Sequence, residues 1–114
     1  MLLADDGRGS KRPSSAALEL RDDETGCSVD VQGRLLRPED PESAVAGHPV
    51  EWGLARFSTG AARFKDQHRV VGDARMDNAA HALVIPTAAS RAAQKRNFSR
   101  LARAMEWVRP PDVG

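Results

Sequence analysis

The stretch that decides the fold runs from residue 80 to residue 108 and reads AHALVIPTAASRAAQKRNFSRLARAMEWV. Its first six residues, 80–85, are mostly apolar, and Pro86 then removes a backbone donor, which predicts a strand that stops at this proline. Ser90 is a residue type that caps helices, so we expect a helix from Ser90 to about Glu106. One apolar stripe follows this helix at helical spacing, made of Phe98, Leu101, Ala102 and Met105.

Upstream segments predict the sheet on which this stripe packs. Cys27, Val29 and Val31 alternate with polar residues, which is the period of a half-buried strand. Segments 50–57 and 68–72 also predict strands. The remaining elements are a loop over 37–49, which holds three prolines, and a helical turn over 58–64 capped by Ser58 or Thr59. We therefore expect an α+β fold, a mainly antiparallel sheet of about four strands packed by the C-terminal helix.

The chain of 114 residues fits one domain. We expect residues 1–11, which hold two glycines and several charges, to be a flexible tail before a single domain over 12–111. Cys27 is the only cysteine, which favours a reducing compartment. The N-terminus does not read as a signal peptide and no apolar run approaches membrane length, so we expect a soluble, cytoplasmic protein without a membrane partner. Its oligomeric state is left open.

Charge is divided unevenly along the chain. The formal net charge is +1, but residues 1–51 hold 6 basic against 11 acidic side chains, and residues 52–114 hold 11 basic against 5 acidic. An acidic lobe that screens a basic one is one interpretation of this division. A basic surface offered to a partner is the other.

His81 is the leading candidate for chemistry, since it lies at the entry of an apolar strand shortly after two turn carboxylates. A neutral imidazole there could act as a general base oriented by Asp77 or Asp73. The alternative is structural: the ring packs on the sheet and caps the turn. No nucleophile is fixed by the spacing, so the sequence favours the structural alternative.

Two other groups are candidates for binding. Arg12 with Ser14 or Ser15 could hold a phosphate or carboxylate, although an ordinary capped turn also explains them. A row of arginines on the helix face opposite the apolar stripe could meet nucleic-acid phosphates, or be a solvated face: Arg96, Arg100 and Arg103. The three histidines are far apart and the cysteine has no partner at zinc-ligand spacing, so we expect neither a metal site nor a cofactor.

Several segments together carry a family resemblance. They are Arg12–Ala17, Ser28–Asp30, Gly53–Ala55, Asp77–Val84 and Leu101–Val108. In this order the chain resembles a group of short bacterial proteins of unassigned activity with an RPSS-A start, an SVD strand, a DNPAHAL turn and strand, and a closing LAR-A-EWV-PP helix. The resemblance covers roughly residues 12–111, and Ala79 stands where the pattern has proline. It implies a folded domain and draws attention to His81, Arg12, Ser14 and Ser15 without giving them roles.

The first functional hypothesis is a non-enzymatic interaction or accessory protein of a bacterial operon, with a protein as partner. The second is a small enzyme or ligand-binding domain in which His81, Arg12 and Ser14 or Ser15 share one pocket. The third is a nucleic-acid binder that uses the basic C-terminal helix.

Overall fold

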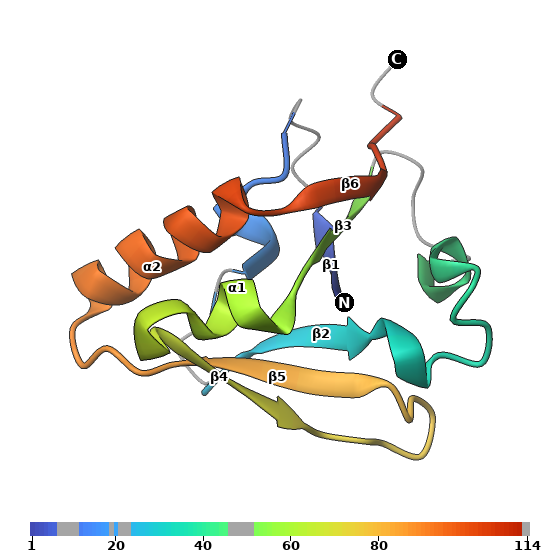
Figure 1. The fold of residues 1–114 in the computed structure, drawn as a ribbon, viewed down its shortest axis with the longest axis horizontal. Coiled ribbons are helices and arrows are strands. Elements are labelled where there is room, and N and C mark those ends of the chain that lie inside the picture. The colour runs from blue at the N-terminus through green and yellow to red at the C-terminus, as the bar shows by residue number, and fades with distance from the viewer. Residues whose placement is uncertain (7–11, 19, 21–23, 46–51, 113–114) are drawn as a thin grey trace.

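Six strands form one sheet in the computed structural model, which describes residues 1–6, 12–18, 20, 24–45 and 52–112 (Figure 1). The strands are β1 (Leu2–Asp6), β2 (Cys27–Val31), β3 (Gly53–Phe57), β4 (His68–Gly72), β5 (His81–Pro86) and β6 (Glu106–Arg109). Their order is β4-β5-β2-β1-β3-β6, and each of these neighbouring pairs is antiparallel. The α+β prediction is confirmed, with six strands in place of about four.

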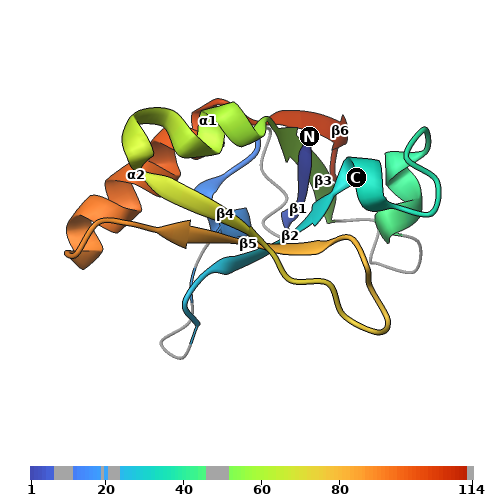
Figure 2. The ribbon, with the colours of Figure 1, turned by 60° about the horizontal axis from the view of Figure 1, so that its bottom comes forward.

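Among the described residues, two α-helices and four 3-10 turns lie between the strands. The helices are α1 (Thr59–Arg63) and α2 (Arg91–Arg103), and the turns are η1 (Ser15–Leu18), η2 (Gln32–Arg34), η3 (Pro41–Val45) and η4 (Phe64–Asp66). Ser58, not Thr59, caps α1, because its hydroxyl accepts from the backbone N–H of Ala61 at 3.0 Å. Ser90 caps α2 in the same way. Figure 2 shows α1 and α2 on the same side of the sheet.

The main core lies between the sheet and these helices, on what we call the helix-covered face. The buried side chains on this side are Phe98, Leu101 and Ala102 of α2, Met105 just beyond the end of α2, Leu18 of η1 and Ala62 of α1. They meet alternate residues of four strands: Leu2, Ala4, Cys27, Val29, Ala55, Phe57, Ala82 and Val84. The predicted apolar stripe therefore does pack on the sheet, and residues 81–86 are extended as expected.

Residues 2–6 are not part of a flexible tail, contrary to our prediction. They form β1, which lies near the middle of the sheet between β2 and β3. Leu2 and Leu3 are each at most 2% exposed and point to opposite faces, so both faces of β1 are covered. Its sequence LLADD groups the leucines and the aspartates instead of alternating apolar and polar residues, which is why it resembles a tail. Residues 7–11 lie outside the described part.

The helix also ends sooner than predicted. It stops at Arg103, and the N–H groups of Ala104 and Met105 bond back to Leu101 and Ala102 in a tight turn. Residues 106–109 then form β6 along β3. The Trp107 ring crosses Gly53, where an added Cβ would collide with it. Extended pairing with β3 thus replaces the last helical turn.

Two other predicted segments also differ in detail from the structure. The strand expected over 50–57 is described from Gly53 onward, since 50 and 51 lie outside the described part. The expected loop over 37–49 contains η3. Across the described ranges we find no helix with both the length and the apolar character to cross a membrane.

The opposite surface of the sheet, which we call the open face, is only partly covered. Leu3 and Leu54 are buried there against Leu35 and Val108. The sheet twists strongly between β2 and β1, since β2 runs across the view of Figure 1 and β1 stands almost upright. This twist and the polar side chains of the open face shape the candidate site.

Candidate functional site

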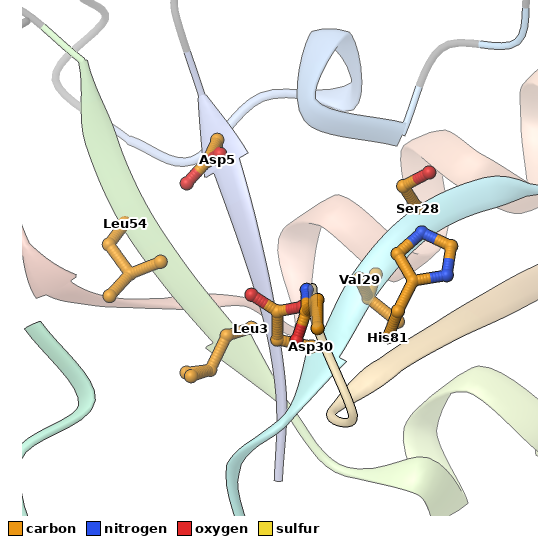
Figure 3. Close-up of a pocket in the computed structure, with 8 residues that line it drawn as sticks. Leu3, Asp5, Ser28, Val29, Asp30, Leu54 and His81 are labelled. Atoms are coloured by element: carbon orange, nitrogen blue, oxygen red, sulfur yellow. The ribbon is translucent and has the colours of Figure 1, made fainter. Parts of the chain in front are cut away.

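A pocket of about 260 Å³ opens on the open face where β1 and β2 separate (Figure 3). β1 pairs with β3 along its whole length but with β2 only at Leu2 and Leu3. Beyond that point the two strands diverge in Figure 3, with Asp5 on one side of the gap and Ser28 on the other. The lining residues are Leu3, Asp5, Ser28, Val29, Asp30, Leu54, Asn78 and His81.

The sheet register places the polar lining in adjacent strands. Asp30 of β2 lies directly opposite His81 of β5 and, on its other side, opposite Leu3 of β1. Ser28 is two residues along β2 from Asp30, so it shares the open face with Asp30. Because His81 lies directly opposite Asp30, Ser28 is the diagonal neighbour of His81 across the two strands. The apolar side chains Leu3 and Leu54 complete the wall toward β3.

His81 is fixed at one ring nitrogen by Asp73. Its Nδ1 lies 3.0 Å from the Asp73 carboxylate oxygen Oδ2 and 3.1 Å from the Asp73 backbone carbonyl. Both of these atoms accept hydrogen bonds, so Nδ1 carries the proton in the neutral ring and Nε2 is an acceptor. In Figure 3 the edge of the ring away from Cβ points toward Ser28. His81 thus presents a lone pair on the pocket side while it is only 7% exposed.

Asp73 and His81 meet because they close the same hairpin. The backbone N–H of Asp73 donates to the carbonyl of His81 at 2.9 Å, which ends the β4–β5 ladder. Arg75 also bonds the Asp73 carboxylate, at 3.3 Å, and both of these side chains are well exposed. The carboxylate is therefore held between a histidine and an arginine.

Asp30 is held by Asn78, which belongs to the tight turn of that hairpin. Asn78 Nδ2 donates to Asp30 Oδ1 at 2.7 Å, and Asn78 Oδ1 accepts from the backbone N–H of Ala80 at 3.1 Å. The turn itself is closed by two backbone bonds between Arg75 and Asn78. Asn78 therefore orients one oxygen of Asp30, and no described residue bonds the other.

The structure separates the residues that the second hypothesis joins. His81 lies in the pocket with Asp73 behind it, whereas Asp77 is exposed and is not part of the lining. Arg12, Ser14 and Ser15 precede or begin η1, which packs against α2 through Leu18 on the helix-covered face. None of these three lines the His81 pocket. The single site that combines them with His81 is not formed.

The arginine row does lie on one side of α2, but its members differ. Arg96 and Arg103 are exposed. Arg100 is half-buried, and it donates to Gln67 Oε1 at 2.6 Å and to the carbonyl of Ala61 at 2.9 Å. Burial, and then the charge of Arg103, lower the pKa of Arg100.

Four polar lining residues were missed at the sequence level. Ser28 and Asp30 carried a usable signal, because they are the polar positions of an alternating strand and so face away from the main core. Asn78 is a residue type typical of turns, and its sequence position predicted nothing more. Asp5 lies in the segment that we predicted to be a flexible tail. Over the ranges that the structure describes, no three or more His, Cys, Asp or Glu side chains are grouped so as to hold a metal ion.

Comparison with known proteins gives no further guide to this site. The chain matches no protein-family model, and neither the curated proteins nor the solved structures contain a significant match to it. The resemblance to short bacterial proteins stays a prediction.

Proposed function

We propose that this protein is a small ligand-binding domain whose open-face pocket takes a cationic nitrogen group, an ammonium or a guanidinium. One observation carries the proposal. Asp73 fixes the His81 ring so that Nε2, an acceptor, lies on the same pocket wall as the Asp30 carboxylate. A ligand that donates hydrogen bonds and carries positive charge satisfies both groups.

The rest of the lining supports the same ligand class. Asp5 adds a second carboxylate to the wall formed by β1. Leu3 and Leu54 complete the wall toward β3, but each is at most 2% exposed, so the carboxylates and His81 determine the ligand class. A volume of about 260 Å³ is slightly below the range usual for drug-sized ligands, so it suits the end of a ligand rather than a large molecule.

The pocket supports binding better than it supports acyl transfer. Ser28, His81 and Asp73 are the residue types of a serine hydrolase, but no hydrogen bond joins Ser28 to His81. An oxyanion would also form beside the carboxylates of Asp30 and Asp5, which disfavour negative charge. Binding without catalysis agrees with the expected role of an accessory protein of a bacterial operon, which remains part of this proposal.

Nuclear magnetic resonance titration tests the ligand class. Butylamine hydrochloride and butylguanidine, at millimolar concentration and pH 7, are expected to shift the backbone amide signals of Ser28, Asp30 and His81. Butanol and butyrate are the matched neutral and anionic probes, and they are expected to leave these signals in place. Equal or larger shifts with butyrate, or no shift with either cationic probe, would refute the proposal.

Two substitutions locate the site. Asp30→Asn keeps an oxygen for Asn78 but removes the charge, so affinity for butylguanidine is expected to fall about tenfold or more, the usual strength of a bond to a charged group. Asp77→Asn removes an exposed carboxylate outside the pocket and serves as the control, with unchanged affinity. A similar loss in both variants would mean that bulk charge, not the pocket, attracts the cation.

A further inference from the structure

A second surface, independent of the pocket, lies on the helical side of the molecule. We call it the basic face: the exposed side of α2 with Arg96 and Arg103, and the adjoining turn η4 with Phe64 and Lys65. α2 contains five basic residues and no acidic one. The whole chain has a net charge of only +1, so this positive charge is local. The hydrogen bonds from Arg100 to Gln67 and Ala61 hold the two parts of the face together.

The basic face includes an exposed aromatic ring. Phe64 is 49% exposed although it is a large apolar residue. The guanidinium carbon of Arg100 lies 5.0 Å from the ring centroid, and Lys65 Nζ lies 5.4 Å from it. Both distances are within the range of cation–π attraction. An aromatic side chain flanked by cations combines a stacking surface with sites for phosphate.

The chain holds this ring at the surface at an energetic cost. Lys65 and Asp66, which follow Phe64, have φ angles of 50° and 55°, in the left-handed region that non-glycine residues rarely adopt. Thr87 supports the turn, since its hydroxyl donates to the carbonyl of Asp66 at 2.6 Å and its N–H donates to that of Gln67 at 3.1 Å. Such strained positions persist where surrounding contacts fix them, and they cluster at functional sites.

We infer that the basic face binds single-stranded nucleic acid. A base stacks on Phe64, and the phosphates on either side of it pair with Lys65, Arg96 and Arg103. Arg96 and Arg103 are seven residues apart, about 10 Å along the helix, so they can contact different phosphates. Single strands fit better than duplexes, because a base is available for stacking on a side chain only when it is unpaired. A partner recognised by charge alone would not need the exposed ring.

Fluorescence anisotropy with a fluorescein-labelled oligothymidylate tests this inference. The unaltered protein is expected to bind, with an affinity that falls as salt rises. The double variant Arg96→Gln/Arg103→Gln is expected to reduce the slope of log affinity against log salt by about 1.4, because each contact with a single strand contributes about 0.7. Phe64→Leu is expected to weaken binding about fivefold or more while the salt slope stays unchanged.

The matched control is Arg34→Gln/Arg37→Gln. It makes the same change in net charge on exposed residues of η2 and the following loop, at the other end of the molecule in Figures 1 and 2. Its affinity is expected to stay close to that of the unaltered protein. Thermal unfolding of every variant checks that the fold is kept, and Arg100 is left in place because it joins α2 to α1.

Four outcomes would overturn the inference. The first is no binding at low salt, and the second is an equal loss in the control variant. The third is tighter binding of duplex than of single-stranded DNA. The fourth is equal competition by polyglutamate or by anionic lipid vesicles, which would show that the face recognises negative charge in general.

Discussion

At the scale of single residues, two buried histidines of similar exposure have different surroundings. Two acceptor atoms of Asp73 lie beside Nδ1 of His81, and the His81 side chain lines the pocket. His68 is 2% exposed; its Nδ1 bonds the carbonyl of Ala62 at 3.0 Å, and its ring lies 4.6 Å from that of Phe98. No described residue bonds His68 Nε2, which is buried. Burial first, and then the charge of Arg100, lower the pKa of His68, against the opposing effect of the bond to Ala62.

This environment predicts that acid destabilises the protein through His68. The folded state binds a proton less readily than the unfolded state, so the contribution of neutral His68 is complete above pH 6.5 and is lost as pH falls below that value. His68→Phe keeps an aromatic ring but cannot titrate. Urea unfolding from pH 7.5 to pH 5 is expected to show that the unaltered protein loses more stability than this variant. Parallel losses would assign the acid sensitivity to other groups.

At the scale of elements, the start of α2 is fixed by its cap and not by complementary charge. Its first turn contains no acidic residue to complement the helix dipole. The Ser90 hydroxyl instead accepts from the N–H of Ala93 at 3.1 Å. The Gln94 side chain reaches back to the carbonyl of Ala88 at 2.8 Å and fixes the approach to the helix. The start of α2 is therefore determined by local hydrogen bonds.

Removal of the cap is expected to weaken the whole domain. Ser90→Ala should lower the free energy of unfolding by about 1 kcal/mol, the usual value for the loss of an N-cap hydroxyl. Ser99→Ala removes the same group from an exposed position inside α2, where alanine is the better helix former, and should be neutral or slightly stabilising. Denaturant unfolding of both variants measures the difference. An equal effect of the two substitutions would contradict the assigned cap.

At the scale of the whole molecule, one core joins both ends of the chain. β1 lies inside the sheet and β6 lies at its edge beside β3, so residues near both termini contribute strands. The α2 stripe covers the sheet on one face, and the pocket opens on the other. The pocket opens on the open face of the sheet and the basic face belongs to α2 and η4 on the other side, so the two proposed sites share no surface.

Truncation of the stripe tests the single core. Leu101 is 0% exposed, so Leu101→Ala is expected to cost about 2–5 kcal/mol of unfolding free energy, a large part of the total for a domain of this size. Leu36 is 104% exposed, and Leu36→Ala is expected to change stability little. Denaturant unfolding compares the two. A small effect of Leu101→Ala would mean that α2 does not close the core.

The sequence by itself determined the elements whose pattern is local. Alternation identified β2, apolar runs identified β4 and β5, and the stripe together with Ser90 identified α2. The contact between His81 and Asp73 could also be predicted from the sequence, because the two residues close one hairpin and are eight positions apart.

Only the tertiary structure decided the rest. The sequence of β1 does not alternate apolar and polar residues, and β6 begins where the predicted C-terminal helix was expected to end. Pairing with β3 determined both strands. The approach of Asp30 to His81, and the gap between β1 and β2, depend on the register of strands that are distant in sequence. Register is chosen by burial on both faces of a complete sheet, and no local segment contains that information.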